Sequence, residues 1–144
     1  MLAIIPARYA STRFPAKPLA VLGRKCIIEW VYCAAKRVFD DVVVATDDQR
    51  IYDAVMAFGG KVMMTSTEHN SGTDRCCEIV EKIGDKYDAV VNIQGDEPFI
   101  NPEQINQIAS LIATEESQIA SLCKPIKDED ELFDENVVKV VFDK

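Results

Sequence analysis

Hydrophobic residues are spaced along the chain in two alternating patterns. Short, largely apolar runs rich in β-branched residues are typical of buried parallel strands. They occur at residues 2–5, 42–46, 61–65, 87–93, 119–123 and 137–142. The run at 87–93, which reads Y-D-A-V-V-N-I, predicts a central strand most clearly.

Between these runs, apolar residues recur three and four positions apart, as on the buried face of a helix. This spacing predicts helices at residues 26–38, 49–58, 73–83, 101–114 and 128–133. Asp47 and Asp48 stand where the second helix needs an N-cap, and Gly59 and Gly60 would end it. The alternation predicts an α/β protein with a mostly parallel sheet and helices on both faces.

The segment after the first strand carries the most informative chemistry. Pro6 is expected to end that strand, and residues 7–19 then read A-R-Y-A-S-T-R-F-P-A-K-P-L, without any acidic residue. The prolines in this segment disfavour a helix, so we expect a long cationic loop at the C-terminal end of the strand. Ligands bind at this edge of open α/β sheets, and cations with free backbone N–H groups suit a polyphosphate.

The charge distribution supports an anionic ligand. Residues 1–37 hold seven Lys or Arg and one acid, whereas the remainder holds nine Lys or Arg and 23 acids. A basic pole on a protein of net charge −8 favours a small anion that the local field can steer. It argues against a nucleic-acid polymer, which usually requires a wide basic face.

Composition restricts the remaining classes. The chain has 144 residues, 48% of them hydrophobic, which is enough for one core and predicts a single domain. No apolar run is long enough to cross a membrane, and the first one is too short for a secretory signal. Five cysteines without a C-x-x-C pair, and one histidine, make a zinc site of Cys/His type improbable. A reducing cytoplasm is the expected compartment.

A second polar segment, N-I-Q-G-D-E-P at 92–98, follows the central strand and therefore reaches the same edge of the sheet. Gly95 would let the backbone turn sharply beside a ligand. Asp96 and Glu97 would face a polyphosphate only with a cation between them, and Mg²⁺ binds one or two carboxylates together with phosphate oxygens. We expect Asp96 to hold this metal ion, although an acidic turn that caps the next helix would have the same composition.

A third polar segment, E-H-N-S-G-T-D-R at 68–75, leads into a helix. Ser71 or Thr73 could cap that helix, which would account for both residues without a ligand. His69 has no base or nucleophile near it in the sequence, so we interpret it as an ordinary loop residue.

Four motifs in this order carry a family resemblance: A-R-Y-A-S-T-R-F-P-A-K-P-L, V-A-T-D-D, H-N-S-G-T-D-R and V-N-I-Q-G-D-E-P. Over nearly the whole chain they resemble the 3-deoxy-manno-octulosonate cytidylyltransferases, or CMP-KDO synthetases. The resemblance implies a Rossmann-like fold of the nucleotide-diphospho-sugar transferase type. It also implies transfer of CMP from CTP to the anomeric hydroxyl of KDO, with release of pyrophosphate, for lipopolysaccharide precursor synthesis. Mg²⁺ dependence and a homodimer are further implications.

The resemblance also implies roles for individual residues. The positions that match nucleotide-binding residues of the family are Arg8, Ser11, Lys17, Arg75 and Gln94. Asp96 matches the Mg²⁺ ligand, and together with Arg8 and Lys17 it would carry catalysis by positioning and charge. Gln94 would also lie near the sugar.

The sequence departs from the family at two points. Phe14 and Ala16 stand where relatives typically have Leu and Gly, and Ala16 could strain a turn that requires positive φ. Relatives also continue beyond position 144. We therefore expect residues 1–144 to be the CTP-binding portion of a single, C-terminally truncated domain. This fragment would lack a second metal-binding Asp, most of the sugar pocket and much of the dimer surface, and would have little or no synthetase activity.

Other functions remain open on the same residues. A cytidylyltransferase for another acidic sugar, such as a sialic acid, would share the scaffold. A molybdenum-cofactor guanylyltransferase is more distant and would prefer GTP. A non-catalytic nucleotide-binding or regulatory module would bind a nucleotide without turning it over.

Overall fold

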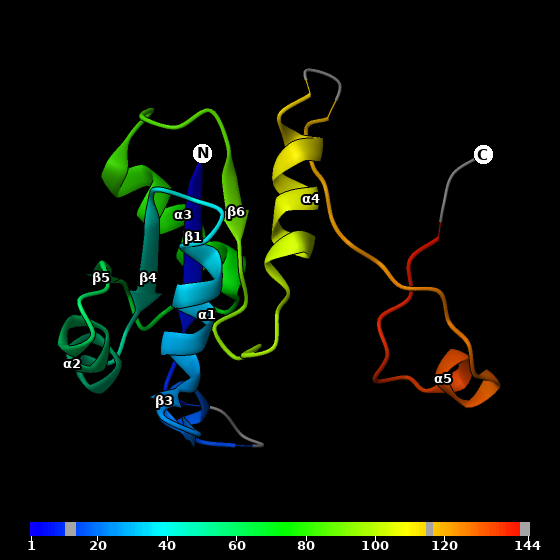
Figure 1. Ribbon diagram of the computed structural model, residues 1–144, viewed down its shortest axis with the longest axis horizontal. Coiled ribbons are helices and arrows are strands. Elements are labelled where there is room, and N and C mark those ends of the chain that lie inside the picture. The colour runs from blue at the N-terminus through cyan, green and yellow to red at the C-terminus, as the bar shows by residue number, and fades with distance from the viewer. Residues whose placement is uncertain (11–13, 115–116, 142–144) are drawn as a thin grey trace.

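A four-stranded parallel sheet forms the centre of the molecule, in a computed structural model that describes residues 1–10, 14–114 and 117–141. Its strands are β1 (Leu2–Ala7), β4 (Val42–Thr46), β5 (Val62–Met64) and β6 (Val90–Asn92). The strand order is β5-β4-β1-β6 (Figure 1). The chain moves outward from β1 through β4 to β5 and then returns to pair β6 with the other side of β1. The boundary between β1 and β6 is therefore the topological switch point, where ligands bind in this class of fold.

Helices cover both faces of the sheet, as the alternating sequence pattern predicts. One face packs against α1 (Ile27–Ala35), α2 (Gln49–Ala57) and α4 (Pro102–Ile112), and the other packs against α3 (Gly72–Ile83). Figure 1 shows α1 and α3 on opposite sides of β1. Along β1, Ile5 belongs to the core between the sheet and α1, α2 and α4, whereas Ile4 belongs to the core between the sheet and α3. Both side chains are fully buried. Among the described helices, none has the length and hydropathy needed to span a bilayer.

The helices begin at the residues that the sequence indicates. Asp48 caps α2 by accepting the Arg50 backbone N–H at 2.9 Å. Ser71 caps α3 in a reciprocal box with Asp74, and Asn101 caps α4, in which Pro102 is the first residue. The short helix α5 (Glu129–Phe133) has its own cap as well. These caps satisfy backbone donors that a helix leaves unpaired at its N-terminus, which explains why the predicted starts are close to the observed ones.

Pro6 does not end the first strand, contrary to expectation, because β1 continues to Ala7. Leu2 and Ile4 make their backbone hydrogen bonds toward β6, so the nitrogen of Pro6 faces the same way. Since β6 ends at Asn92, which is level with Ile4, no carbonyl of β6 requires a donor at Pro6. The opposite edge of β1 meanwhile stays paired with β4 as far as Ala7.

The strands predicted at 119–123 and 137–142 are wrong for the residues that the structure describes, which exclude 142. Residues 119–123 and 137–141 have no regular strand, and Ile119, Val138 and Val141 are more than 90% exposed. No neighbouring strand pairs with either segment, and β-branched composition alone does not form a strand. In the described part of the chain, β6 consequently lies at an edge of the sheet and is only three residues long, so its predicted central position is also wrong.

The connection from β1 to α1 contains structure that the sequence analysis missed. A single 3₁₀ turn spans Lys17–Leu19, and a small antiparallel hairpin joins β2 (Val21–Leu22) to β3 (Lys25–Cys26). Gly23 begins the two-residue turn of this hairpin with a φ of 69°. The glycine was the available signal, since a positive φ in a two-residue loop is typical of hairpins.

Candidate nucleotide site

A cavity of about 210 Å³ opens at the C-terminal ends of β1 and β6. It lies at the switch point between the two strands, and its walls also come from the cationic loop and the start of α3. Five of the six residues assigned by resemblance line this one cavity: Arg8, Lys17, Arg75, Gln94 and Asp96. Ser11, the sixth, lies outside the described residues. Segments far apart in the sequence therefore meet where the motifs predict a ligand.

Lys17 and Asp96 form an ion pair across the cavity. The Lys17 Nζ atom lies 2.7 Å from Asp96 Oδ2, and both side chains are partly exposed to solvent. The pair joins the cationic loop to the turn after β6, although the two residues are 79 positions apart. Because exposed ion pairs contribute little net stability, this contact can open when a ligand offers either partner a better one.

Gly95 allows the turn that carries Gln94 and Asp96 to press against the end of β1. A Cβ atom at Gly95 would lie 2.8 Å from the carbonyl oxygen of Pro6 and 3.2 Å from Ile28 Cδ1. The glycine is needed for this close approach of backbones rather than for a positive φ. The Q-G-D sequence thereby places an amide and a carboxylate beside β1.

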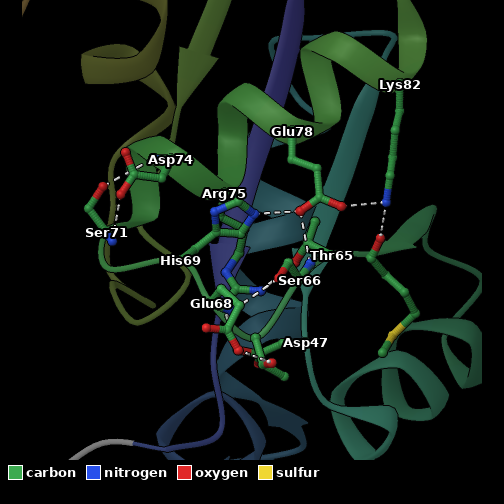
Figure 2. Close-up of polar contacts among 12 residues, drawn as sticks. Asp47, Thr65, Ser66, Glu68, His69, Ser71, Asp74, Arg75, Glu78 and Lys82 are labelled. Atoms are coloured by element: carbon green, nitrogen blue, oxygen red, sulfur yellow. Dashed lines mark hydrogen bonds and ion pairs between the residues drawn. The ribbon is translucent and has the colours of Figure 1, made fainter.

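Arg75 forms part of the cavity wall, but its guanidinium is bound to the protein (Figure 2). One nitrogen donates to Asp47 Oδ2 at 2.6 Å and another donates to the hydroxyl of Thr65. The Arg75 side chain is only 3% exposed. It therefore ties α3 to the C-terminal ends of β4 and β5. Its predicted place beside the nucleotide remains a prediction.

His69 also lines the cavity, and it has the partner that the sequence analysis did not find. Its Nε2 atom contacts Glu78, which accepts the Ser66 backbone N–H at 2.8 Å and pairs with Lys82 at 2.6 Å (Figure 2). Lys82, the Ser66 amide and His69, in that order of effect, lower the pKa of Glu78 to about 2. Glu78 is thus an ionised acceptor, and the Nε2 atom of His69 donates to it. The nine-residue separation is no recognised motif, so only the folded loop reveals the pair.

The cationic loop closes on itself at its base. Tyr9 accepts the backbone N–H of Ala16 at 2.9 Å, which brings Arg8 close to Lys17. Arg8 is exposed and makes no ion pair or hydrogen bond with the rest of the described chain. Ala16 has φ 59° and ψ 19°, which confirms the expectation of a positive-φ turn, and it is the only described non-glycine residue with a positive φ.

The side chains that line the cavity fit a hard divalent cation that takes part of its coordination from the phosphates of a bound nucleotide. No group of three or more His, Cys, Asp or Glu side chains comes together among the described residues, so they contain no metal site built only from protein. Asp96 instead offers a carboxylate on the wall that Arg8 and Lys17 also line. One carboxylate combined with phosphate oxygens is how Mg²⁺ is commonly bound.

Comparisons with known proteins show the family of the chain. Residues 2–144 match the cytidylyltransferase family. The chain is 58% identical to the 3-deoxy-manno-octulosonate cytidylyltransferase of Parabacteroides distasonis, over 98% of this chain and 58% of that protein. It is 61% identical to the protein of the same name from Bacteroides thetaiotaomicron, over 86% of this chain and 50% of that protein.

A solved structure is similar as well. It is described as CMP:2-keto-3-deoxy-manno-octonic acid synthetase complexed with CTP, and it matches with a TM-score of 0.73 and 44% identity. The match covers 77% of this chain and 46% of the solved one. The chain thus spans about half the length of the curated relatives that it matches.

Proposed function

The chain belongs to the cytidylyltransferase family, and we propose that it serves the transfer of CMP from CTP to KDO with release of pyrophosphate. The observation that carries this proposal is the meeting of Arg8, Lys17 and Asp96 in one cavity at the switch point. The relatives named 3-deoxy-manno-octulosonate cytidylyltransferase favour KDO over other acidic sugars. Because the chain spans about half of their length, we assign to the described residues the nucleotide side of the reaction.

Arg8 and Lys17 would bind the triphosphate. Both are cations that line the cavity, and Arg8 makes no ion pair or hydrogen bond among the described residues that a phosphate would need to displace. Lys17 would exchange its contact with Asp96 for a phosphate oxygen. In the transition state these cations would neutralise the charge that develops on the leaving pyrophosphate.

Asp96 would hold Mg²⁺, and Gln94 lies on the same turn next to the reacting groups. The metal ion, when bound, supplies positive charge to the phosphates and orients them. The carboxylate of Asp96 would position that charge at the end of β6. Gln94, whose amide nitrogen donates to Asn92 Oδ1 at 3.1 Å, would present its amide oxygen to a hydroxyl or amino group of the substrates.

The bond changes are those of an in-line substitution at phosphorus. The oxygen of the anomeric hydroxyl forms a bond to the α-phosphorus of CTP and gives its proton to water. The bond from that phosphorus to the bridging oxygen breaks, and pyrophosphate leaves with the bonding electrons. No covalent enzyme intermediate is needed. Cys76, which follows Arg75 in the chain, lies in the core and not in the cavity wall, and burial raises its pKa to about 11, so its thiol stays protonated.

The setting of the reaction is part of the same proposal. We place it in the cytoplasm, in lipopolysaccharide precursor synthesis, with a homodimer as the working assembly. These assignments rest on the resemblance of the motifs to the 3-deoxy-manno-octulosonate cytidylyltransferases.

Calorimetric titration of the chain with CTP, GTP and UTP, each with and without Mg²⁺, tests the nucleotide side. We expect binding that is selective for CTP and strengthened by Mg²⁺, and we expect Lys17→Met to weaken it about tenfold or more. Asp96→Asn should abolish the effect of Mg²⁺. Arg37→Met is the matched control, because it removes an exposed arginine that does not line the cavity. Figure 1 shows that α1, which ends two residues before Arg37, runs from the cavity side of the sheet toward the N-terminal ends of the strands.

The other outcomes separate the alternatives. Selective binding of GTP would move the chain to a guanylyltransferase branch. CTP binding with transfer of CMP to a sialic acid, and not to KDO, would change the sugar assignment. No binding of any nucleotide by a chain that circular dichroism shows to be folded would contradict the proposed nucleotide site.

A further inference from the structure

Tyr9 and Arg50 form a stacked pair outside the cavity. The Cζ atom of Arg50 lies 3.3 Å from the centroid of the Tyr9 ring, well inside the range of a cation–π contact. Tyr9 directly follows Arg8 in the cationic loop, whereas Arg50 belongs to the first turn of α2. The contact therefore connects the loop after β1 to the helix after β4, and neither residue lines the cavity.

Asp48 fixes the plane of the Arg50 guanidinium. Arg50 Nε donates to Asp48 Oδ1 at 2.9 Å, and a terminal nitrogen donates to Oδ2 at 2.6 Å. Asp48 is itself held as the N-cap of α2, and its backbone N–H donates to the Thr46 hydroxyl at 3.3 Å. The Arg50 guanidinium lowers the pKa of Asp48, which keeps the carboxylate ionised. A two-point contact of this kind sets the orientation of a planar group, so the guanidinium is in place without a ligand.

The position of Tyr9 determines the position of both cations of the loop. Arg8 precedes Tyr9 directly, and the Tyr9 carbonyl accepts the N–H of Ala16, the residue before Lys17. The Ala16 carbonyl in turn accepts the N–H of Leu19, which starts the turn that follows. These two backbone hydrogen bonds close the base of the loop, and the first of them attaches Ala16 directly to Tyr9.

We propose that Arg50 is a positioning residue for the nucleotide site: by stacking on Tyr9 it holds Arg8 and Lys17 at the distance that a triphosphate requires. This inference rests on the proposed function. Arg50 lies outside the cavity and would act through the loop, and its two hydrogen bonds to Asp48 orient the guanidinium toward Tyr9 rather than toward the phosphates. Lysine could not replace it fully, because an ammonium group lacks the planar fork that Asp48 orients.

Hydrogen exchange of single amides, combined with titration of CTP and Mg²⁺, tests the proposal. In Arg50→Met the Ala16 amide should exchange faster while the amide of Val44 in the core strand β4 keeps its wild-type rate. The same variant should bind CTP about fivefold more weakly, in keeping with the loss of one cation–π contact. For Arg50→Lys, both the exchange rate of the Ala16 amide and the affinity for CTP should lie between those of wild type and Arg50→Met.

Variants of Tyr9 provide the matched comparison. Tyr9→Phe keeps the ring and should bind CTP as wild type does, whereas Tyr9→Leu should bind as weakly as Arg50→Met. The double variant Arg50→Met, Tyr9→Leu should be no weaker than either single variant, because both remove the same contact. Arg37→Met, which removes an exposed arginine elsewhere, should change neither measurement.

Three results would overturn the inference. Wild-type exchange of Ala16 in a folded Arg50→Met variant would show that the stack does not hold the loop. Equal acceleration of the Ala16 and Val44 amides would show that Arg50 acts on global stability alone. Additive losses in the double variant would show that the two residues act separately. If wild-type protein binds no CTP, the proposed function fails, and the Ala16 amide still reports whether Arg50 holds the loop.

Discussion

Two segments of nearly the same composition differ in structure, because only one of them forms a strand. β4 reads V-V-V-A-T and is buried at every position, whereas residues 137–141 read V-V-K-V-V and form no strand. Val44 is fully buried, but Val138 and Val141 are each 91% exposed. In Figure 1 the first segment lies inside the sheet and the second lies in the red C-terminal part, away from it. Apolar composition therefore does not decide which of the two becomes a strand.

The difference lies in the partners that each segment finds. β4 has β1 on one edge, β5 on the other, and helices over both faces. None of the described residues between 117 and 141, which we call the C-terminal segment, is buried. A strand gains its free energy from paired edges and covered faces, and burial of one Val or Ile side chain contributes about 1.5–3 kcal/mol. The same change should therefore have different effects in the two regions.

The loss in the free energy of unfolding should differ most between the two regions when an ion pair is broken. Arg75 and Asp47 are paired at 2.6 Å with the arginine buried, whereas Lys124 and Glu131 are paired at 2.5 Å with the lysine 79% exposed. Arg75→Met would leave the Asp47 carboxylate without its cation and should lower the free energy of unfolding by about 3 kcal/mol or more. Lys124→Met should change it by less than about 1 kcal/mol.

Urea unfolding of both variants, followed by far-ultraviolet circular dichroism, measures the two changes. Equal losses in the two variants would contradict the comparison. An Arg75→Met variant too unstable to purify would be replaced by Arg75→Lys, which keeps the charge and should lose less.

The same substitution in the two valine runs gives the next largest difference. Val44→Ala removes two methyl groups from the core and should destabilise the protein by about 2 kcal/mol. Val141→Ala removes the same atoms from an exposed position and should change the free energy of unfolding by less than about 0.5 kcal/mol. Thermal unfolding of the two variants, monitored by calorimetry under one set of conditions, compares them. A loss above 1 kcal/mol in Val141→Ala would show that the C-terminal segment packs against something in solution.

Local signals in the sequence predicted most of the sheet region. Asp48, Ser71 and Asn101 mark helix starts because capping is settled by a few neighbouring residues. The cavity was predictable for a related reason, since parallel strands deliver their following loops to one edge. The resemblance added roles for Arg8, Lys17 and Asp96, and the structure places these three together.

Features that depend on distant partners could not be predicted in the same way. The edge position of β6 and the failure of 137–141 as a strand depend on which segments lie beside them, and spacing along the chain does not carry that information. The partner of His69 lies on a helix nine residues later, and the ring that Arg50 covers lies 41 residues earlier in the chain. Such contacts appear only when loops fold back on the sheet.

The contribution of a carboxylate to the pH dependence of stability should be larger at Glu78 than in the C-terminal segment. Its pKa is about 2 in the folded protein against an ordinary value of 4.5, so the unfolded chain takes up a proton first as the pH falls. The stabilising contribution of this carboxylate is therefore complete above about pH 5 and is lost as the pH falls from there toward 2. In Glu78→Gln the unfolding free energy should lose part of its dependence on pH in this window.

Asp134 is the matched position in the C-terminal segment. Its pKa is lowered by the backbone amide and side chain of Asn136, its neighbour two residues away. Contacts this local can persist in the unfolded chain, so Asp134→Asn should change the pH dependence less than Glu78→Gln does. Urea midpoints measured from pH 7 to pH 2 test both variants, and a larger effect at Asp134 would reverse the expected order.

The smallest difference is expected at two alanines. Ala16 has a left-handed backbone, which costs about 1–2 kcal/mol for a residue with a Cβ atom, whereas Ala120 in the C-terminal segment has no positive φ. Glycine relieves that cost but loses about 0.5–1 kcal/mol through the greater freedom of the unfolded chain. Ala16→Gly should therefore stabilise the protein by about 0.5 kcal/mol, and Ala120→Gly should leave it unchanged or slightly less stable. Unfolding curves of the two variants measure both changes in the free energy of unfolding. A gain in Ala16→Gly without a gain in Ala120→Gly would show that the cationic loop keeps its strained turn in solution. A loss of stability in Ala16→Gly would mean that residue 16 has left that turn.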